Sequence, residues 1–150
     1  MSRGSDSATV RIDLAQRIDA PARCVWERLV DHEAMPDWFP AREVVRRRPG
    51  TDDPNGSGAI RVMRLFGLAL EEQITAFEPE RRLAYRVTEG APFTEHRAAV
   101  ELEPDGDATR VRWSVCLRPR IPGTGWILRR MISRTLRNGL AGLDRSCREG

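Results

Sequence analysis

The pattern of hydrophobic and polar positions changes three times along the chain. Val10, Ile12 and Leu14 alternate with polar residues, which predicts a half-buried strand. Residues 19–31 then place apolar side chains at helical spacing behind a proline that suits a first helical turn, and they predict a short helix. Residues 32–40 are broken by one proline and closed by another, which predicts a second short helix or turn. The chain is therefore expected to begin with one strand and two short helices.

Strand patterning dominates the middle of the chain. Alternating apolar positions, separated by clusters of turn residues, predict six further strands. These strands are expected at residues 42–48, 59–66, 68–79, 83–87, 94–104 and 109–119. Because consecutive strands with short connections pair side by side, they predict an antiparallel meander. Together with the first strand they predict a curved sheet of seven strands.

A helical period returns near the C-terminus. Over residues 126–149 apolar side chains recur every three or four positions, and arginines gather on the other side. This pattern predicts a long amphipathic helix across the concave face of the sheet, in an α+β fold. A single helix cannot fill the concave side of seven strands. A cavity between the sheet and this helix is therefore expected, and small-molecule sites occupy such spaces.

Two glycines lie inside the predicted C-terminal helix. Gly139 and Gly142 each lower helix stability by roughly 1 kcal/mol relative to alanine. A close approach by a strand, by another protomer or by a ligand would explain them. Close packing against a strand is the expectation favoured here.

The length of 150 residues is that of one domain. Residues 1–8 are small and polar and are expected to form a disordered tail. Residues 9–150 are then expected to form a single ligand-binding domain. No apolar run approaches the roughly 20 residues of a membrane-spanning helix, so no stable membrane insertion is expected. The N-terminus lacks the apolar core of a signal peptide, which favours a cytoplasmic location.

Charge and cysteine content narrow the possible chemistry. The net charge is +3, and all 25 basic residues are arginines. Arg130, Arg134 and Arg137 share one helix face and 46–48 is also basic, but no stacking aromatics are interleaved with them. Solvated faces explain these arginines, although phosphates or anionic lipid are an alternative, and no nucleic-acid partner is expected. Three dispersed cysteines and two histidines offer no zinc spacing, so neither a metal nor a cofactor is expected.

Glu72 falls on the apolar side of the strand at residues 68–79. It has three alternative interpretations: an unpaired carboxylate with a raised pKa that transfers protons, a partner of Arg61 or Arg64 from the adjacent strand, or a residue turned to solvent by a β-bulge. The register of the strand at 59–66 is ambiguous. Either Ile60, Val62 and Phe66 point inward with Arg64, or Met63 and Leu65 point inward with Arg61. The ion pair is favoured.

Three further polar residues carry possible chemistry. His96 lies on a presumed inward face and is a candidate for proton transfer, or else a histidine hydrogen-bonded within the wall. Tyr85 is either a hydrogen-bond donor to a ligand or a core aromatic whose hydroxyl reaches water. His32, at the start of the second short helix, is expected at the surface or in a capping position.

The order of elements and several phrases resemble the SRPBCC superfamily, which has the START-like or helix-grip fold. The phrases are "IDAPARCVWERLVDHEAMPDWFP", "EEQITAFEPERRLAYRVTEGAPF", "VELEPDGDATRVRWSV" and "PRIPGTGWILRR". They are most similar to the polyketide cyclase/dehydrase and lipid transport branch. The resemblance covers residues 9–148 and implies a ligand site between the sheet and the C-terminal helix.

Two functions follow from this resemblance. The first is binding of a hydrophobic or aromatic ligand of polyketide, lipid or quinone type. The second is a cyclase/dehydrase-type enzyme in which His96 or Glu72 moves a proton. A homodimer is left open. The expected ligand-binding residues are Trp38, Phe39, Arg61, Met63, Leu70, Ile74, Tyr85, Val100, Trp113, Ile132 and Leu136.

Overall fold

The computed structural model describes residues 9–149, and the tail predicted at residues 1–8 lies outside them. Seven strands form one antiparallel sheet. They are β1 (Val10–Ile18), β2 (Glu43–Arg48), β3 (Ile60–Leu65), β4 (Leu68–Glu78), β5 (Arg82–Glu89), β6 (Phe93–Asp105) and β7 (Ala108–Pro119). The helices are α2 (Ala22–Val30), the 3₁₀ helix η1 (His32–Asp37) and α3 (Gly125–Glu149). All the predicted elements are present.

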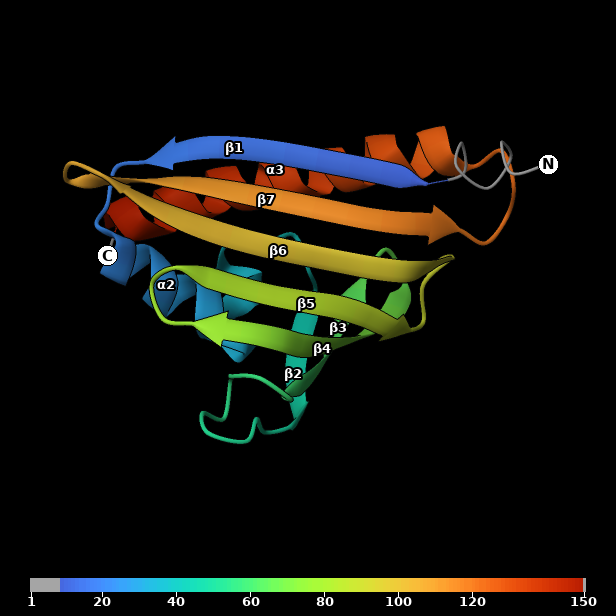
Figure 1. Cartoon of the computed structure of the whole chain (residues 1–150), viewed down its shortest axis with the longest axis horizontal. Coiled ribbons are helices and arrows are strands. Elements are labelled where there is room, and N and C mark those ends of the chain that lie inside the picture. The colour runs from blue at the N-terminus through green and yellow to red at the C-terminus, as the bar shows by residue number, and fades with distance from the viewer. Residues whose placement is uncertain (1–8, 150) are drawn as a thin grey trace.

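The strand order is β1-β7-β6-β5-β4-β3-β2, which confirms the predicted meander from β2 to β7 (Figure 1). The N-terminal strand β1 completes the sheet by pairing with the last strand, β7. The turn between β3 and β4 is tight, and both of its residues, Phe66 and Gly67, have positive φ angles of 54° and 76°. This backbone is typical of the two-residue turns whose twist matches that of antiparallel strands.

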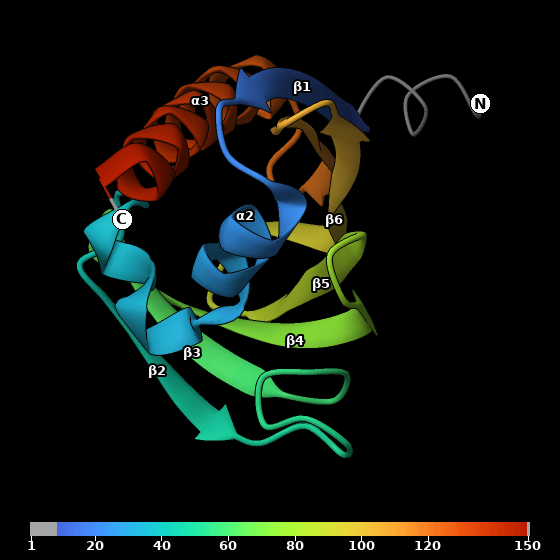
Figure 2. The same ribbon diagram turned by 90° about the vertical axis from the view of Figure 1, so that its left-hand side faces the viewer.

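Helices α2 and α3 both lie on the concave side of the curled sheet, as Figure 2 shows. The apolar face of α3 buries Leu136, Leu140 and Leu143, whereas α2 buries Val25 and Leu29. The predicted helix-grip arrangement is therefore present. Within residues 9–149, no helix has the combination of length and apolar character that a membrane crossing requires.

The expectation that a strand packs against the glycines of α3 was wrong. A Cβ on Gly139 would lie 2.6 Å from the ring of Phe39, and a Cβ on Gly142 would collide with the backbone carbonyl of Trp38. Both neighbours belong to the segment that follows η1. Trp113 of strand β7 would lie 3.7 Å from a Cβ on Gly139, which is an ordinary contact distance. The glycines therefore let the segment after η1, rather than a strand, make the closest approach to the backbone of α3.

Candidate functional site

A cavity of about 280 Å³ lies between the concave face of the sheet and α3. Strands β3 to β7, the beginning of α3, the β5–β6 loop, and Met35 and Phe39 line it. Its polar lining residues are Glu72, Tyr85, His96 and Thr135. The Thr135 hydroxyl donates to the backbone carbonyl of Met131 within α3, which is an ordinary way for a helical threonine to satisfy its donor. The other three polar side chains therefore define the chemistry of the cavity.

The register of β3 settles which of its arginines points inward. Arg61 and Met63 are buried, whereas Arg64 is exposed and pairs with Glu43 at the surface. In the pairing of β3 with β4, Arg61 stands directly opposite Glu72. The side chains of such cross-strand neighbours lie on the same face of the sheet. Their positions therefore favour the ion pair over the other two interpretations of Glu72.

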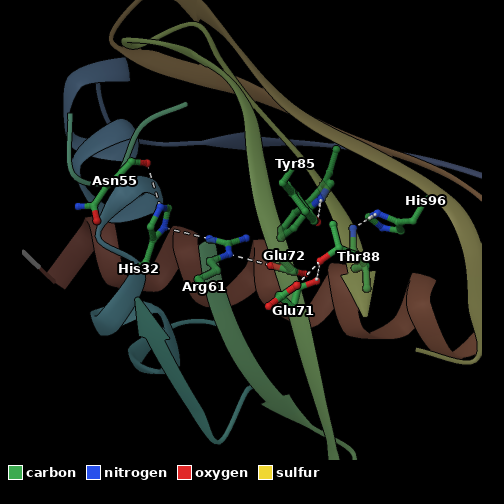
Figure 3. A network of polar contacts seen from close by, with 10 residues as sticks. His32, Asn55, Arg61, Glu71, Glu72, Tyr85, Thr88 and His96 are labelled. Carbon is green, nitrogen blue, oxygen red and sulfur yellow. Dashed lines mark hydrogen bonds and ion pairs between the residues drawn. The ribbon is translucent and has the colours of Figure 1, made fainter. Parts of the chain in front are cut away.

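Glu72 and Arg61 form a buried ion pair. The Arg61 Nε donates to Glu72 Oε1 at 2.7 Å, and the two side chains are only 2% and 6% exposed (Figure 3). A register shift does occur between Glu71 and Glu72, as the bulge interpretation expected. However, it leaves Glu72 pointing inward, and Glu71 instead accepts hydrogen bonds from Arg47 and Thr88 on the other side.

His32 extends this ion pair into a chain of polar contacts. Arg61 Nη1 donates to His32 Nδ1 at 3.0 Å, and His32 Nε2 donates to the carbonyl oxygen of Asn55 at 3.0 Å (Figure 3). Because Arg61 only donates, the ring hydrogen of His32 must be on Nε2 and the imidazole is neutral. Burial, and then the charge of Arg61, lowers the pKa of His32 to about 3.

The prediction of a surface or capping position for His32 was therefore wrong, because its side chain is fully buried. Its partners, Arg61 and Asn55, are distant in the sequence. No local pattern around residue 32 indicates that it accepts a hydrogen bond from a buried arginine. Arg61 is therefore held by two buried partners: Glu72 accepts from its Nε, and His32, which is bonded to Asn55, accepts from its Nη1.

Tyr85 joins the ion pair to the aromatic core. The guanidinium carbon of Arg61 lies 5.2 Å from the centre of the Tyr85 ring, a cation–π distance. The Tyr85 hydroxyl accepts a hydrogen bond from Trp113 Nε1 at 3.0 Å. Burial, and then the charge of Glu72, raises the pKa of Tyr85, so the hydroxyl stays protonated. Within residues 9–149, no acceptor for its hydrogen is found, which leaves it available to a ligand.

His96 lies where strands β5 and β6 separate. Their pairing ends at Tyr85 opposite Ala98, and a β-bulge with a positive φ of 53° at Glu95 follows in β6. Beyond this point the Val87 N–H donates to His96 Nδ1 at 3.0 Å, so a side chain replaces a backbone acceptor (Figure 3). Burial lowers the pKa of His96 to about 4. The neutral ring therefore carries its hydrogen on Nε2 and is a hydrogen-bond donor.

The cavity lining includes eight of the predicted site residues. These are Phe39, Met63, Leu70, Glu72, Tyr85, His96, Ile132 and Leu136. The other five, Trp38, Arg61, Ile74, Val100 and Trp113, are buried but lie outside the lining. Trp38, Phe39 and Trp113 pack together, with ring centres 5.7 to 6.4 Å apart, and fill the space that an open cavity would need.

Several lining residues were absent from the predicted set. Phe93 stacks on His96 with ring centres 5.4 Å apart, and Leu128 and Thr135 come from α3. The apolar period of the C-terminal helix already includes Leu128, so that residue could have been found. Phe93 begins a strand after a loop, and alternation gives no signal there. Among residues 9–149, no group of three histidine, cysteine or acidic side chains could hold a metal ion.

The two buried neutral histidines predict a loss of stability in mild acid. An unfolded histidine binds a proton below its ordinary pKa of 6.5, whereas His32 and His96 bind one only near pH 3 and 4. The unfolded state therefore binds more protons as the pH falls below 6.5. We expect each histidine to lower the free energy of unfolding by up to about 1.4 kcal/mol per pH unit. Urea unfolding between neutral pH and about pH 5 measures this slope, and a His96→Gln variant should show roughly half of it. An unchanged slope in that variant would contradict the neutral assignment of His96.

Comparisons with known proteins identify the family and the fold of this chain. The family model described as "Polyketide cyclase / dehydrase and lipid transport" matches residues 9–148. A START superfamily protein from Mycobacterium smegmatis superposes with a TM-score of 0.80 at 16% identity, over 93% of this chain and 97% of that one.

Two other solved structures have the same fold. A protein from Thermobifida fusca is 27% identical, with a TM-score of 0.75 over 93% of both chains. Ara h 8.0201 is 12% identical, with a TM-score of 0.71 over 95% of this chain and 99% of that one. No curated protein matches the sequence. The family match nevertheless spans nearly the whole described chain and confirms the resemblance drawn from the sequence. The protein belongs to the polyketide cyclase/dehydrase and lipid transport family.

Proposed function

We propose that the protein binds a small hydrophobic or aromatic molecule, of polyketide, lipid or quinone type, in the cavity beneath α3. The observation that carries this proposal is an apolar cavity whose polar groups gather around Glu72, Tyr85 and His96. Burial of apolar ligand surface contributes about 25 cal/mol per Å², before the costs of ordering the ligand are subtracted. Affinity would therefore come mainly from the apolar walls, including Met63, Leu70, Ile132 and Leu136.

The polar residues set the orientation of the ligand. The Tyr85 hydroxyl has a hydrogen to donate, and His96 has its Nε2–H. Glu72 accepts from Arg61 through one oxygen, Oε1. This arrangement suits an apolar body that ends in a carbonyl or hydroxyl group, since the carbonyl accepts from Tyr85 and a hydroxyl can also donate to Glu72. Arg61, Ile74, Val100, Trp38 and Trp113 are then supporting residues behind the lining.

Cavity size favours small ligands or small parts of larger ones. The volume of about 280 Å³ lies just below the roughly 300–1,000 Å³ common for ligand pockets. One or two fused rings match this volume. A longer chain would extend past Phe66, Leu68 and Met131, which line the outer end of the cavity.

A cyclase/dehydrase-type reaction is the alternative, and the geometry favours it less. In the neutral His96 ring the basic nitrogen, Nδ1, already accepts from the Val87 N–H. Glu72 is paired with Arg61, so it is not the unpaired carboxylate on which the proton-transfer interpretation depends. Loss of turnover of a poly-β-keto substrate with retained affinity, in a His96→Gln variant, would favour the enzyme instead.

The cytoplasmic location remains a prediction.

Filling the cavity is expected to weaken ligand binding strongly. Val87 lines the cavity from β5, whereas Val45 is an exposed apolar residue of β2 outside it. We expect a Val87→Trp variant to bind at least about tenfold more weakly than the unmodified protein, because the indole occupies the ligand's volume. Calorimetric titration with menadione, 1-tetralone and dodecanoic acid covers quinone, ketone and lipid chemistry.

The matched control is Val45→Trp, which adds the same side chain outside the cavity and should leave affinity unchanged. Thermal unfolding verifies that both variants are folded. Absence of binding to all three compounds by the unmodified protein would contradict the proposal, as would equal losses in the two variants.

A further inference from the structure

Exposed hydrophobic side chains are concentrated at one end of the molecule, and Phe66, Leu68 and Met131 among them also line the cavity. Phe66, Ile121 and Trp126 are 63%, 64% and 67% exposed. Leu68, Ile127 and Met131 are also exposed, so in the described part of the chain Val45 is the one large exposed hydrophobic residue that lies elsewhere. The β3–β4 turn, the β7–α3 connection and the first turns of α3 carry them, and all three lie at the same end of the molecule, on the right in Figure 1. Such concentration of apolar surface marks an interaction site.

The same end carries arginines without acidic neighbours. No Asp or Glu occurs between residues 118 and 143. Arg129, Arg130, Arg134 and Arg137 are exposed, and none of them forms an ion pair within residues 9–149. On other faces several arginines are paired, such as Arg112 with Asp13, Arg64 with Glu43 and Arg17 with Asp19. Others, such as Arg81 and Arg110, are exposed and form no ion pair with the described residues. Helix α3 is distinguished by carrying four such arginines in a stretch without an acidic residue.

Apolar and cationic residues occupy neighbouring flanks of α3. Trp126 lines a surface groove together with Arg129, Arg130 and Arg137, whereas Met131 faces the mouth of the cavity. An exposed tryptophan beside arginines is typical of residues that lie at a membrane–water interface. Helices with this division of side chains bind anionic bilayers by burying the apolar residues at the headgroup boundary while the cations contact lipid phosphates.

We propose that the end of the molecule formed by the β3–β4 turn, the β7–α3 connection and the beginning of α3 docks onto an anionic lipid bilayer. Phe66, Ile121 and Trp126 enter the headgroup region, and Arg129, Arg130 and Arg134 contact the lipid phosphates. Because Leu68 and Met131 line the cavity, its mouth then faces the bilayer. Docking requires no ligand in the cavity and does not depend on which molecule the cavity binds.

Charge argues against a second copy of this chain as the occupant. A twofold-symmetric interface places the same patch on both subunits. It would bring the unpaired arginines of one α3 against those of the other, and like charges at an interface are unfavourable. A bilayer of anionic lipid instead offers negative charge at high density and an apolar layer directly beneath it. The occupant that satisfies both features of the patch is therefore the anionic bilayer.

Sedimentation with lipid vesicles tests the proposal on the full chain. We expect binding to vesicles of phosphatidylcholine mixed with phosphatidylglycerol, weak binding to phosphatidylcholine alone, and loss of binding at high salt. An Arg129→Glu/Arg130→Glu variant should partition about tenfold or more less strongly. The control Arg81→Glu/Arg110→Glu makes the same charge change at exposed positions of the β4–β5 turn and the start of β7, at the other end of the molecule, and should retain most of the binding. Circular dichroism verifies the fold of each variant.

The apolar component has its own matched pair. Trp126→Ser should weaken vesicle binding and reduce the blue shift of tryptophan fluorescence on adding vesicles, whereas Val45→Ser should do neither. The proposal is overturned if the protein ignores anionic vesicles, or if the two double variants lose binding equally. It is also overturned if light scattering shows a dimer that Trp126→Ser dissociates, since the patch would then be covered by a second copy.

Discussion

Replacing Glu72 with alanine is expected to lower the free energy of unfolding by about 3–5 kcal/mol. The substitution leaves the charged guanidinium of Arg61, whose side chain is 2% exposed, without its carboxylate partner. Removing one member of a buried ion pair is costly because the remaining charge stays desolvated and uncompensated. His32 cannot replace the carboxylate, since it is neutral and supplies a single acceptor atom. Urea unfolding followed by circular dichroism at neutral pH measures the loss.

The neighbouring residue provides the control for this prediction. Glu71 also pairs with an arginine, but its partner Arg47 is 62% exposed. We expect Glu71→Ala to lower stability by less than about 1 kcal/mol, as is typical of ion pairs near the surface. Equal losses in the two variants would show that Arg61 is not buried as described.

A double variant separates the charge from the packing. In Arg61→Met/Glu72→Leu both charges are replaced by apolar side chains of similar size. Such replacements of buried pairs are often neutral or stabilising, so most of the stability lost in Glu72→Ala should return. The expected recovery has a functional consequence: stability alone does not require this ion pair at the cavity wall, which is consistent with a role in orienting the ligand.

Replacing Gly142 with alanine is expected to lower the free energy of unfolding by about 2–3 kcal/mol. Alanine favours the helix by about 1 kcal/mol over glycine, but its Cβ would collide with the backbone carbonyl of Trp38. Backbone atoms cannot rotate away as a flexible side chain can, so the segment after η1 must shift and the aromatic cluster beneath it must repack. Chemical unfolding at neutral pH measures the difference.

Asn138→Ala is the matched control on the exposed face of the same helix. It removes no buried contact, and the propensity of alanine should raise stability by a few tenths of a kcal/mol. If Gly142→Ala also raised stability, the prediction would be contradicted. The backbone at Trp38 would then be able to move away from the added Cβ at little cost in free energy.

The strands and helices were predictable because each has a strong period of its own. The face of β3 that points inward could not be predicted. Arg61 and Arg64 place one arginine on each face of the strand, so the alternation of apolar and polar residues does not distinguish the two faces. Only the opposite strand decides the matter: Glu72 stands across from Arg61. A buried arginine is stable because its partners are buried with it, and partners from other elements leave no local pattern.

The depth of the cavity was less predictable than its walls. Alternation correctly placed Val100 and Trp113 on the inward face, where both are buried. It could not show that Trp38 and Phe39, from the segment after η1, pack against Trp113 and close this part of the concave face. Which inward residues line an open space depends on side chains contributed by other elements, and the volume of those side chains is set by packing in three dimensions.

The separation of β5 from β6 has a mechanical consequence for the sheet. Strands β6 and β7 pair along nearly their whole lengths, whereas β5 and β6 pair only from Arg82 opposite Glu101 to Tyr85 opposite Ala98. The sheet thus consists of two stiffer halves, β1-β7-β6 and β5-β4-β3-β2, joined by a narrow strip. Near the mouth, a single hydrogen bond between Val87 and His96 spans the seam. Breaking it costs about 0.5–1.5 kcal/mol, so we expect the sheet to separate more easily at this part of the seam than where the strands are fully paired, which would widen the mouth of the cavity.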